Sequence, residues 1–131
     1  MSESFKLEII SPDKILLQSD VKQVSIPGYE GTMTVLKDHI PLVTFMRPGF
    51  VNVDTKDSKF EKFYVEDGTV EFYENILLIL SSTIINIKEF NKEKVDNLIQ
   101  AAQKEIEKEE ISDKIKYILS YKIETLKEIN L

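Results

Sequence analysis

Apolar and polar residues alternate over short segments in the first two thirds of the chain. Phe5, Leu7 and Ile9 are separated by charged residues, which is the two-residue period of a strand with one buried face. Further strand-like segments lie at residues 15–17, 24–26, 32–36, 42–46, 50–53, 60–65, 69–72 and 76–80. Turn-forming pairs such as Asp67-Gly68 separate them. Many short strands at a spacing of roughly 8–12 residues, with no helix-length segment between them, predict an antiparallel sandwich or barrel.

The last third of the chain has the period of helices. Its first apolar stripe steps by three and four residues through Val95, Leu98, Ile99, Ala102 and Ile106. A second pattern runs through Ile115, Ile118, Leu119, Lys122, Leu126 and Ile129. Asn91 and Ser112 are placed to cap the two helices, and Glu93 and Asp113 suit their first turns. The short connection at residues 108–111 predicts an antiparallel helical hairpin.

Glycine and proline divide the chain into two parts. All four glycines and all four prolines fall within residues 1–86, and residues 87–131 have neither. We therefore expect a β-sandwich domain at residues 1–86 and a two-helix hairpin at residues 87–131. A pair of short helices, each with a single apolar stripe, is marginally stable alone and needs a surface to dock on. The hairpin is thus interpreted as a movable appendage.

Composition and charge exclude several classes of function. The 131 residues contain 23 acidic and 17 basic side chains, for a net charge of −6, which argues against nucleic acid as the ligand. The longest apolar run, residues 76–80, predicts a buried strand, and no run approaches the roughly 18 residues of a membrane-spanning helix. The first residues lack the pattern of a secretion signal. We expect a soluble protein of the cell interior, without lipid insertion.

Candidate catalytic chemistry is sparse. The chain has no cysteine and a single histidine, His39, so thiolate sites are excluded and zinc chemistry has few ligands. The adjacent Asp38 and His39 do not have the arrangement of a Ser-His-Asp triad, and no phosphate-binding glycine loop is present. The acidic residues 105, 107, 109 and 110 alternate with lysines, which favours a solvated, salt-bridged face over a metal site. No catalytic residue, metal site or cofactor is predicted.

Several spaced motifs resemble one known family. The chain reads SPDK at residues 11–14, PGYEG at 27–31, HIPLVT at 39–44, RPG at 47–49 and EKFYVEDGTVEF at 61–72. In this order they resemble the epsilon subunit of the rotary ATP synthase, over most of residues 5–86. The resemblance implies a ten-stranded sandwich followed by the helical hairpin. It also implies a non-catalytic central-stalk subunit, peripheral to the cytoplasmic face of the bacterial inner membrane.

The resemblance further implies partners and contact residues. The sandwich would bind the γ subunit and the polar loops of the c-ring, coupling proton-driven rotation to ATP synthesis in the catalytic head. The c-ring contact would comprise Tyr29, Glu30, Gly31, Thr32 and His39. The hairpin of such subunits can extend into the α/β catalytic head and obstruct ATP hydrolysis. Its contacts there would be the basic residues Lys114, Lys116, Lys122 and Lys127, for which ordinary solvated lysines are the competing interpretation.

One family feature is degraded in this sequence. Some bacterial members bind ATP at the start of the first helix through a motif like Leu-Asp-x-x-Arg-Ala. The matching positions here are Phe90, Asn91, Lys94 and Val95, which lack both the carboxylate and the planar guanidinium. We therefore predict no nucleotide site.

Two other classes of protein remain as alternatives. A free-standing β-sandwich adaptor or small-ligand-binding domain would be monomeric, without affinity for γ. A small hydrolase would need a buried carboxylate with a perturbed pKa in a cleft.

Overall fold

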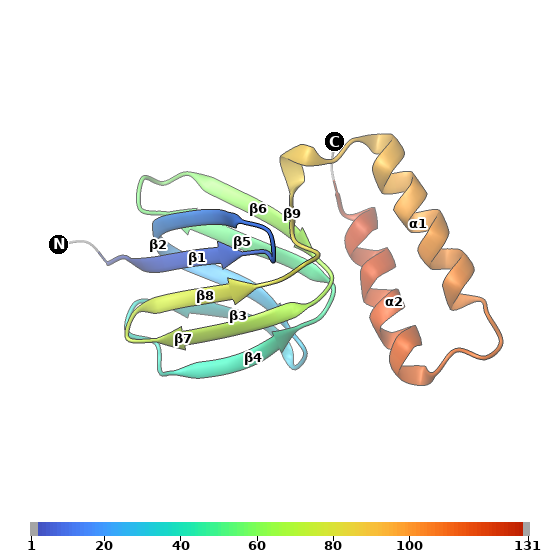
Figure 1. Cartoon of the computed structure of the whole chain (residues 1–131), viewed down its shortest axis with the longest axis horizontal. Helices are drawn as coiled ribbons and strands as arrows, with labels where there is room; N and C mark the ends of the chain where they lie inside the picture. Colours follow the sequence, from blue (N-terminus) through green and yellow to red (C-terminus); the bar gives the residue numbers. More distant parts are fainter. Residues whose placement is uncertain (1–2, 130–131) are drawn as a thin grey trace.

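The computed structural model describes residues 3–129 and has a β-sandwich beside a helical hairpin (Figure 1). Within these residues nine strands are present: β1 (Phe5–Ile10), β2 (Ile15–Gly28), β3 (Gly31–Leu36), β4 (Leu42–Met46), β5 (Gly49–Thr55), β6 (Phe60–Val65), β7 (Gly68–Tyr73), β8 (Ile76–Leu80) and β9 (Ile85–Asn86). A 3-10 turn, η1 (Ile87–Glu89), leads to α1 (Lys92–Ile106) and α2 (Asp113–Lys127). The predicted mainly β sandwich followed by a hairpin is confirmed.

The strand count differs from the predicted ten for two reasons. Residues 15–17 and 24–26, predicted as separate strands, belong to the continuous 14-residue β2. In addition, β9 has two residues and pairs only through Phe63↔Asn86 and Tyr64↔Ile85, too short for any period to identify. The sheet is also not wholly antiparallel, because β1 and β8 run parallel from Lys6↔Ile76 to Ile10↔Leu80.

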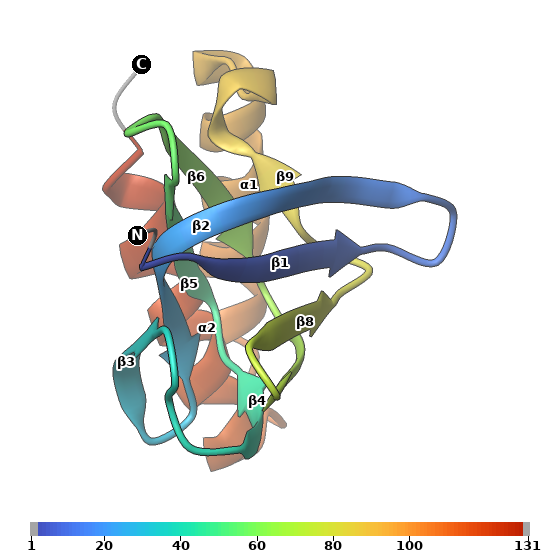
Figure 2. The ribbon, with the colours of Figure 1, turned by 90° about the vertical axis from the view of Figure 1, so that its left-hand side faces the viewer.

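The long strand β2 joins the two layers of the sandwich. Its first half pairs with β1, from Ile15 to Val21, and its second half pairs with both β3 and β5. Figure 2 shows β2 running from its turn with β1 toward β3 and β5. One layer contains β1, β8, β7 and β4, and the other contains β3, β2, β5, β6 and β9. The two halves of β2 belong to different layers. The polar residues in its middle lie where the strand passes from one layer to the other, and they do not interrupt it.

Buried apolar residues form a core between the layers. The largest fully buried members include Phe72, Leu7, Ile9, Ile26, Met46, Leu77 and Ile79. A second cluster joins the hairpin to the sandwich and comprises Tyr64, Phe90, Val95 and Leu126, with Phe50, Leu98 and Ile99 among the partly buried residues around it. The hairpin is therefore docked on one end of the sandwich (Figure 1).

Both helices begin at the predicted caps. The Asn91 side chain accepts a hydrogen bond from the Lys94 backbone N–H at 2.8 Å, and the Ser112 hydroxyl accepts one from Ile115 at 3.2 Å. Each cap satisfies a backbone donor that the first helical turn leaves free. The predicted helix starts and the hairpin are confirmed. Among the described residues, neither helix has the length and hydropathy needed to cross a bilayer.

Candidate interaction surfaces

The outward side of β4, β7 and β8 exposes large apolar side chains. Val43 is 70% exposed, Phe45 59%, Tyr73 64%, Ile76 47% and Leu80 39%. We call these five residues the apolar face. The ladders bring them together, because Phe45 pairs with Thr69, which pairs with Leu80, and Tyr73 pairs with Ile76. Exposed apolar side chains grouped on a sheet in this way are typical of interaction surfaces.

The interpretation of residues 76–80 as a buried strand was wrong in part. Leu77 and Ile79 are fully buried, whereas Ile76 and Leu80 point outward and are exposed. The apolar face was missed because a continuous apolar run is typical of a strand covered on both sides. The same signal is present at residues 42–46, where Val43 and Phe45 add apolar side chains on the outward side of β4.

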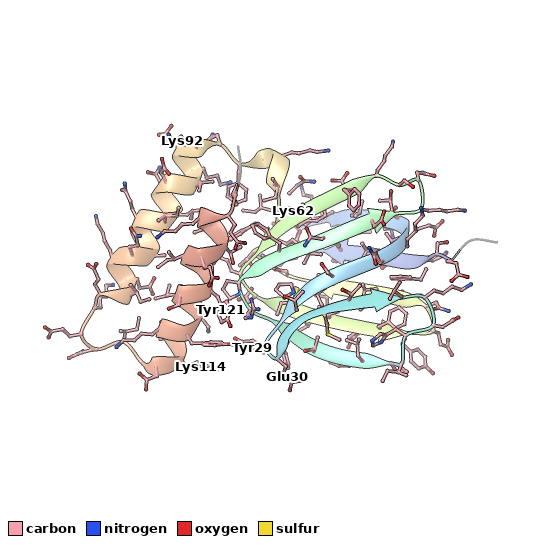
Figure 3. All side chains as sticks on the ribbon, turned by 180° about the vertical axis from the view of Figure 1, so that it is seen from behind. Tyr29, Glu30, Lys62, Lys92, Lys114 and Tyr121 are labelled. Carbon is pink, nitrogen blue, oxygen red and sulfur yellow. The ribbon has the colours of Figure 1, made fainter. Side chains whose placement is uncertain are left out.

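The turn between β2 and β3 lies at the end of the sandwich nearest α2. Figure 3 shows Tyr29 and Glu30 there, close to Lys114 and Tyr121. Gly28 pairs with Gly31, whose φ of 127° closes the turn with a conformation that favours glycine. The Tyr29 backbone N–H donates to the Phe45 carbonyl at 3.1 Å. Tyr29 and Glu30 are exposed, as a contact with a partner requires.

His39 is not brought together with this turn. It follows β3 at the strand's other end, about 20 Å away for six residues at about 3.3 Å each. Its ring is half-buried and packs edge-on against Phe72 at 6.0 Å, and its Nδ1 is 2.7 Å from the Ile40 carbonyl. The neighbouring Asp38 faces Asn75 instead, whose side-chain amide donates to its carboxylate at 2.9 Å. The two adjacent residues therefore do not act as a pair.

Polar contacts add to the apolar cluster that docks the hairpin. The Lys122 ammonium on α2 lies 3.2 Å from the Glu66 carboxylate, and the Tyr64 hydroxyl donates to the same carboxylate at 2.9 Å. Burial, together with the neighbouring Glu66 carboxylate, raises the pKa of the Tyr64 phenol. The Tyr117 hydroxyl reaches the Tyr29 carbonyl at 3.5 Å. The hairpin is thus tied to β6 and to the β2–β3 turn.

The four lysines of the predicted inhibitory contact have different surroundings. Lys114, Lys116 and Lys127 are exposed on α2. Lys122 is partly buried, because its ammonium pairs with the sandwich. In the docked hairpin, Lys122 is therefore a docking residue.

The residues at the positions of the degraded ATP motif take part in packing the hairpin or in capping α1. Phe90 and Val95 are buried in the docking cluster, and the Phe90 ring lies edge-on to Tyr64 at 5.5 Å. Asn91 caps α1, and the Lys94 ammonium lies 5.2 Å from the centroid of the Phe90 ring. Within residues 3–129, no three histidine or acidic side chains are grouped to hold a metal ion. The acidic residues at 105, 107, 109 and 110 are exposed.

Comparison with known proteins identifies the family. Residues 4–87 match the model of the ATP synthase delta/epsilon chain β-sandwich domain. Over 131 residues, the chain is 42% identical to the ATP synthase epsilon chain of Pelagibacter ubique, covering 99% of this chain and 100% of that one. The chain belongs to the ATP synthase epsilon chain family.

Other relatives of the epsilon chain family extend the comparison. The ATP synthase epsilon chain of Sinorhizobium fredii is 34% identical over 106 residues, covering 81% of this chain and 79% of that one. A chain of the Euglena gracilis mitochondrial ATP synthase has a TM-score of 0.81 at 21% identity, covering 97% of this chain and 81% of that one. One from the central stalk and c-ring of the Tetrahymena thermophila enzyme has a TM-score of 0.64 at 15% identity, covering 94% and 93%. These two structures share the fold.

Proposed function

We propose that this chain is a non-catalytic rotor subunit in the central stalk of a bacterial ATP synthase. The sandwich binds the γ subunit and transmits proton-driven rotation of the c-ring to ATP synthesis in the catalytic head. The observation that carries this proposal is the apolar face, whose Val43, Phe45 and Tyr73 are each more than half exposed. A subunit that works alone does not require such a face. A subunit that packs against another in a stalk does, because the contact covers the exposed apolar side chains. Membership of the epsilon chain family supports γ as the partner.

The β2–β3 turn is the proposed contact with the c-ring. Tyr29 and Glu30 are exposed at its tip, flanked by Gly31 and Thr32. An exposed aromatic side chain beside a carboxylate suits a polar loop on a partner. Because His39 lies at the opposite end of β3, a single partner surface that covers the turn does not also reach it. We therefore restrict the proposed c-ring contact to residues 29–32.

The hairpin, residues 87–131, is the proposed regulatory part, and residues 1–86 form the coupling part. Among the described residues, the hairpin is docked by one apolar cluster, the ion pair between Lys122 and Glu66, the Tyr117 hydroxyl at the Tyr29 carbonyl and the Arg47 guanidinium on the Tyr121 ring. Release of these contacts would free the hairpin to extend toward the catalytic head. Lys114, Lys116 and Lys127 are exposed already, and Lys122 would become available on release. In the extended form these lysines would contact acidic surface and obstruct ATP hydrolysis.

A binding titration tests the rotor assignment. The full chain is added to its cognate catalytic head, γ included, from which this subunit has been removed. We expect saturable one-to-one binding, strongly weakened by Val43→Asp, because a buried carboxylate opposite γ has no partner. Thr34→Asp, an exposed position on β3 in the other layer, is the matched control and should bind as the unchanged chain does. Absence of binding by the unchanged chain would overturn the proposal and favour a free-standing adaptor.

A further inference from the structure

A large open pocket lies between the sandwich and the start of α2. Its volume is about 1070 Å³. Its lining includes the apolar side chains of Ile10, Phe45 and Leu80 and the polar ones of Tyr29, Asp67 and Lys114. Figure 3 shows Lys114 on α2 on the same side of the molecule as Tyr29. The pocket lining therefore combines apolar side chains with one ammonium group and one carboxylate.

The two parts of the chain both contribute to this pocket. Of the residues that line it, only Lys114 comes from the hairpin, and the rest lie between Ile10 and Ser82. If the hairpin leaves the sandwich, the pocket loses one wall and its cation. A ligand that uses both parts therefore binds the docked form more tightly and shifts the population toward it.

The charges of the pocket indicate what it would bind. The ion pairs found within residues 3–129 are Lys88 with Glu61 and Lys122 with Glu66, so the Lys114 ammonium has no carboxylate partner there. The Asp67 carboxylate already accepts a hydrogen bond from the Thr83 hydroxyl at 3.2 Å. A ligand segment with an apolar side chain followed by an acidic group fits this arrangement. The apolar side chain would pack on Phe45 and Leu80, and the acidic group would pair with the Lys114 ammonium.

The pocket is continuous with the apolar face. Phe45 and Leu80 belong to both, exposed by 59% and 39%. A partner that covers the apolar face therefore also reaches the pocket. We propose that the γ partner places an apolar side chain and a neighbouring carboxylate in this pocket, and that their contact with Lys114 holds the hairpin docked. This inference rests on the proposed binding of γ to the apolar face.

The test measures hairpin position and affinity together. The chain contains no cysteine, so Asp57→Cys and Ser120→Cys, both exposed positions, place one spin label on the sandwich and one on α2. The labelled full chain is bound to the catalytic head that lacks this subunit. Distances between the labels then distinguish the docked hairpin from an extended one.

Lys114→Glu is compared with the matched control Lys104→Glu, an exposed position on α1 of the same hairpin, outside the pocket. We expect Lys114→Glu to weaken binding on the order of fivefold to tenfold and to add a longer-distance population. Lys104→Glu should leave both readouts unchanged. If Lys114→Glu keeps the docked distance and the affinity of the control, the inference is overturned. If instead Val43→Asp binds as tightly as the unchanged chain, the proposed γ contact itself has failed.

Discussion

The guanidinium carbon of Arg47 lies 3.9 Å from the centroid of the Tyr121 ring. Arg47 lies in the turn between β4 and β5, and Tyr121 lies on α2, so this contact joins the sandwich to the hairpin. The Arg47 Nη1 donates to the Pro48 carbonyl at 3.0 Å. Its Nε is buried and finds no hydrogen-bond acceptor among the described residues. The face of the Tyr121 ring therefore supplies a principal favourable interaction for the Arg47 guanidinium.

Replacing the aromatic ring should loosen the docked hairpin. Tyr121→Leu keeps an apolar side chain but removes the π face, and we expect docking to weaken by about 1 kcal/mol. Hydrogen exchange of the α2 amides in the isolated full chain measures this as about fivefold faster exchange through undocking. Tyr73→Leu, on the apolar face away from the hairpin, is the control. Unchanged α2 exchange in Tyr121→Leu would show that the ring does not hold the hairpin.

The Lys122–Glu66 ion pair should couple the hairpin to β6. Both side chains are partly buried, at 20% and 29% exposed, so solvent screens the pair only in part. A double-mutant cycle with Lys122→Met and Glu66→Gln should give a coupling energy of about 0.5–1 kcal/mol in hairpin docking. The glutamine keeps an acceptor for the Tyr64 hydroxyl, which limits the cycle to the charge interaction. Strictly additive effects of the two changes would argue against the pair.

Tyr64 should make stability depend on alkaline pH. Its pKa is raised in the folded protein by burial and by Glu66, so the folded state retains the phenolic proton longer than the unfolded chain does. The contribution of Tyr64 to the free energy of unfolding is complete below about pH 10. Above that pH the unfolded chain ionises first, and the contribution falls by about 1.4 kcal/mol per pH unit.

Tyr64→Phe isolates this effect. Near pH 8 it should lower the free energy of unfolding by about 1 kcal/mol, because the hydrogen bond to Glu66 is lost. Between pH 10 and 11 the difference should shrink, since phenylalanine does not ionise in the unfolded chain. Urea unfolding at a series of pH values measures both. Parallel curves for the two proteins up to pH 11 would contradict the burial of this hydroxyl.

Removing the hairpin should release ATP hydrolysis. Deletion of residues 88–131 should raise the hydrolysis rate of the assembled enzyme, because no extended helix can then enter the catalytic head. The deletion also exposes the docking cluster around Tyr64, so a full-length variant is needed beside it. Changing Lys116 and Lys127 together to serine leaves that cluster, the Lys122 ion pair and Lys114 in place. Equal hydrolysis rates in all three enzymes would remove the inhibitory role.

Local signals in the sequence sufficed for the helices and for most strands. Asn91 and Ser112 cap helices because the bond each makes is to a backbone group three residues away, which a local pattern contains. The alternation at Phe5, Leu7 and Ile9 likewise places three side chains in the core.

Contacts between residues far apart in the sequence could not be predicted from those local signals. Lys122 pairs with Glu66, 56 positions earlier in the chain, and no spacing rule connects them. The tip residue Tyr29 and His39 are close in sequence, yet a whole extended strand separates them. The outward exposure of Ile76 and Leu80 depends on which elements cover β8, and the apolar run itself does not contain that information.

Proton-driven ATP synthesis tests the central claim most directly. Membrane vesicles that hold the enzyme without this subunit are supplied with the full chain, and ATP formation is followed after a proton gradient is imposed. We predict that the unchanged chain and Thr34→Asp restore synthesis, whereas Val43→Asp does not, because it disrupts the apolar face that we propose binds γ. Full restoration by Val43→Asp, or no restoration by the unchanged chain, would contradict the account.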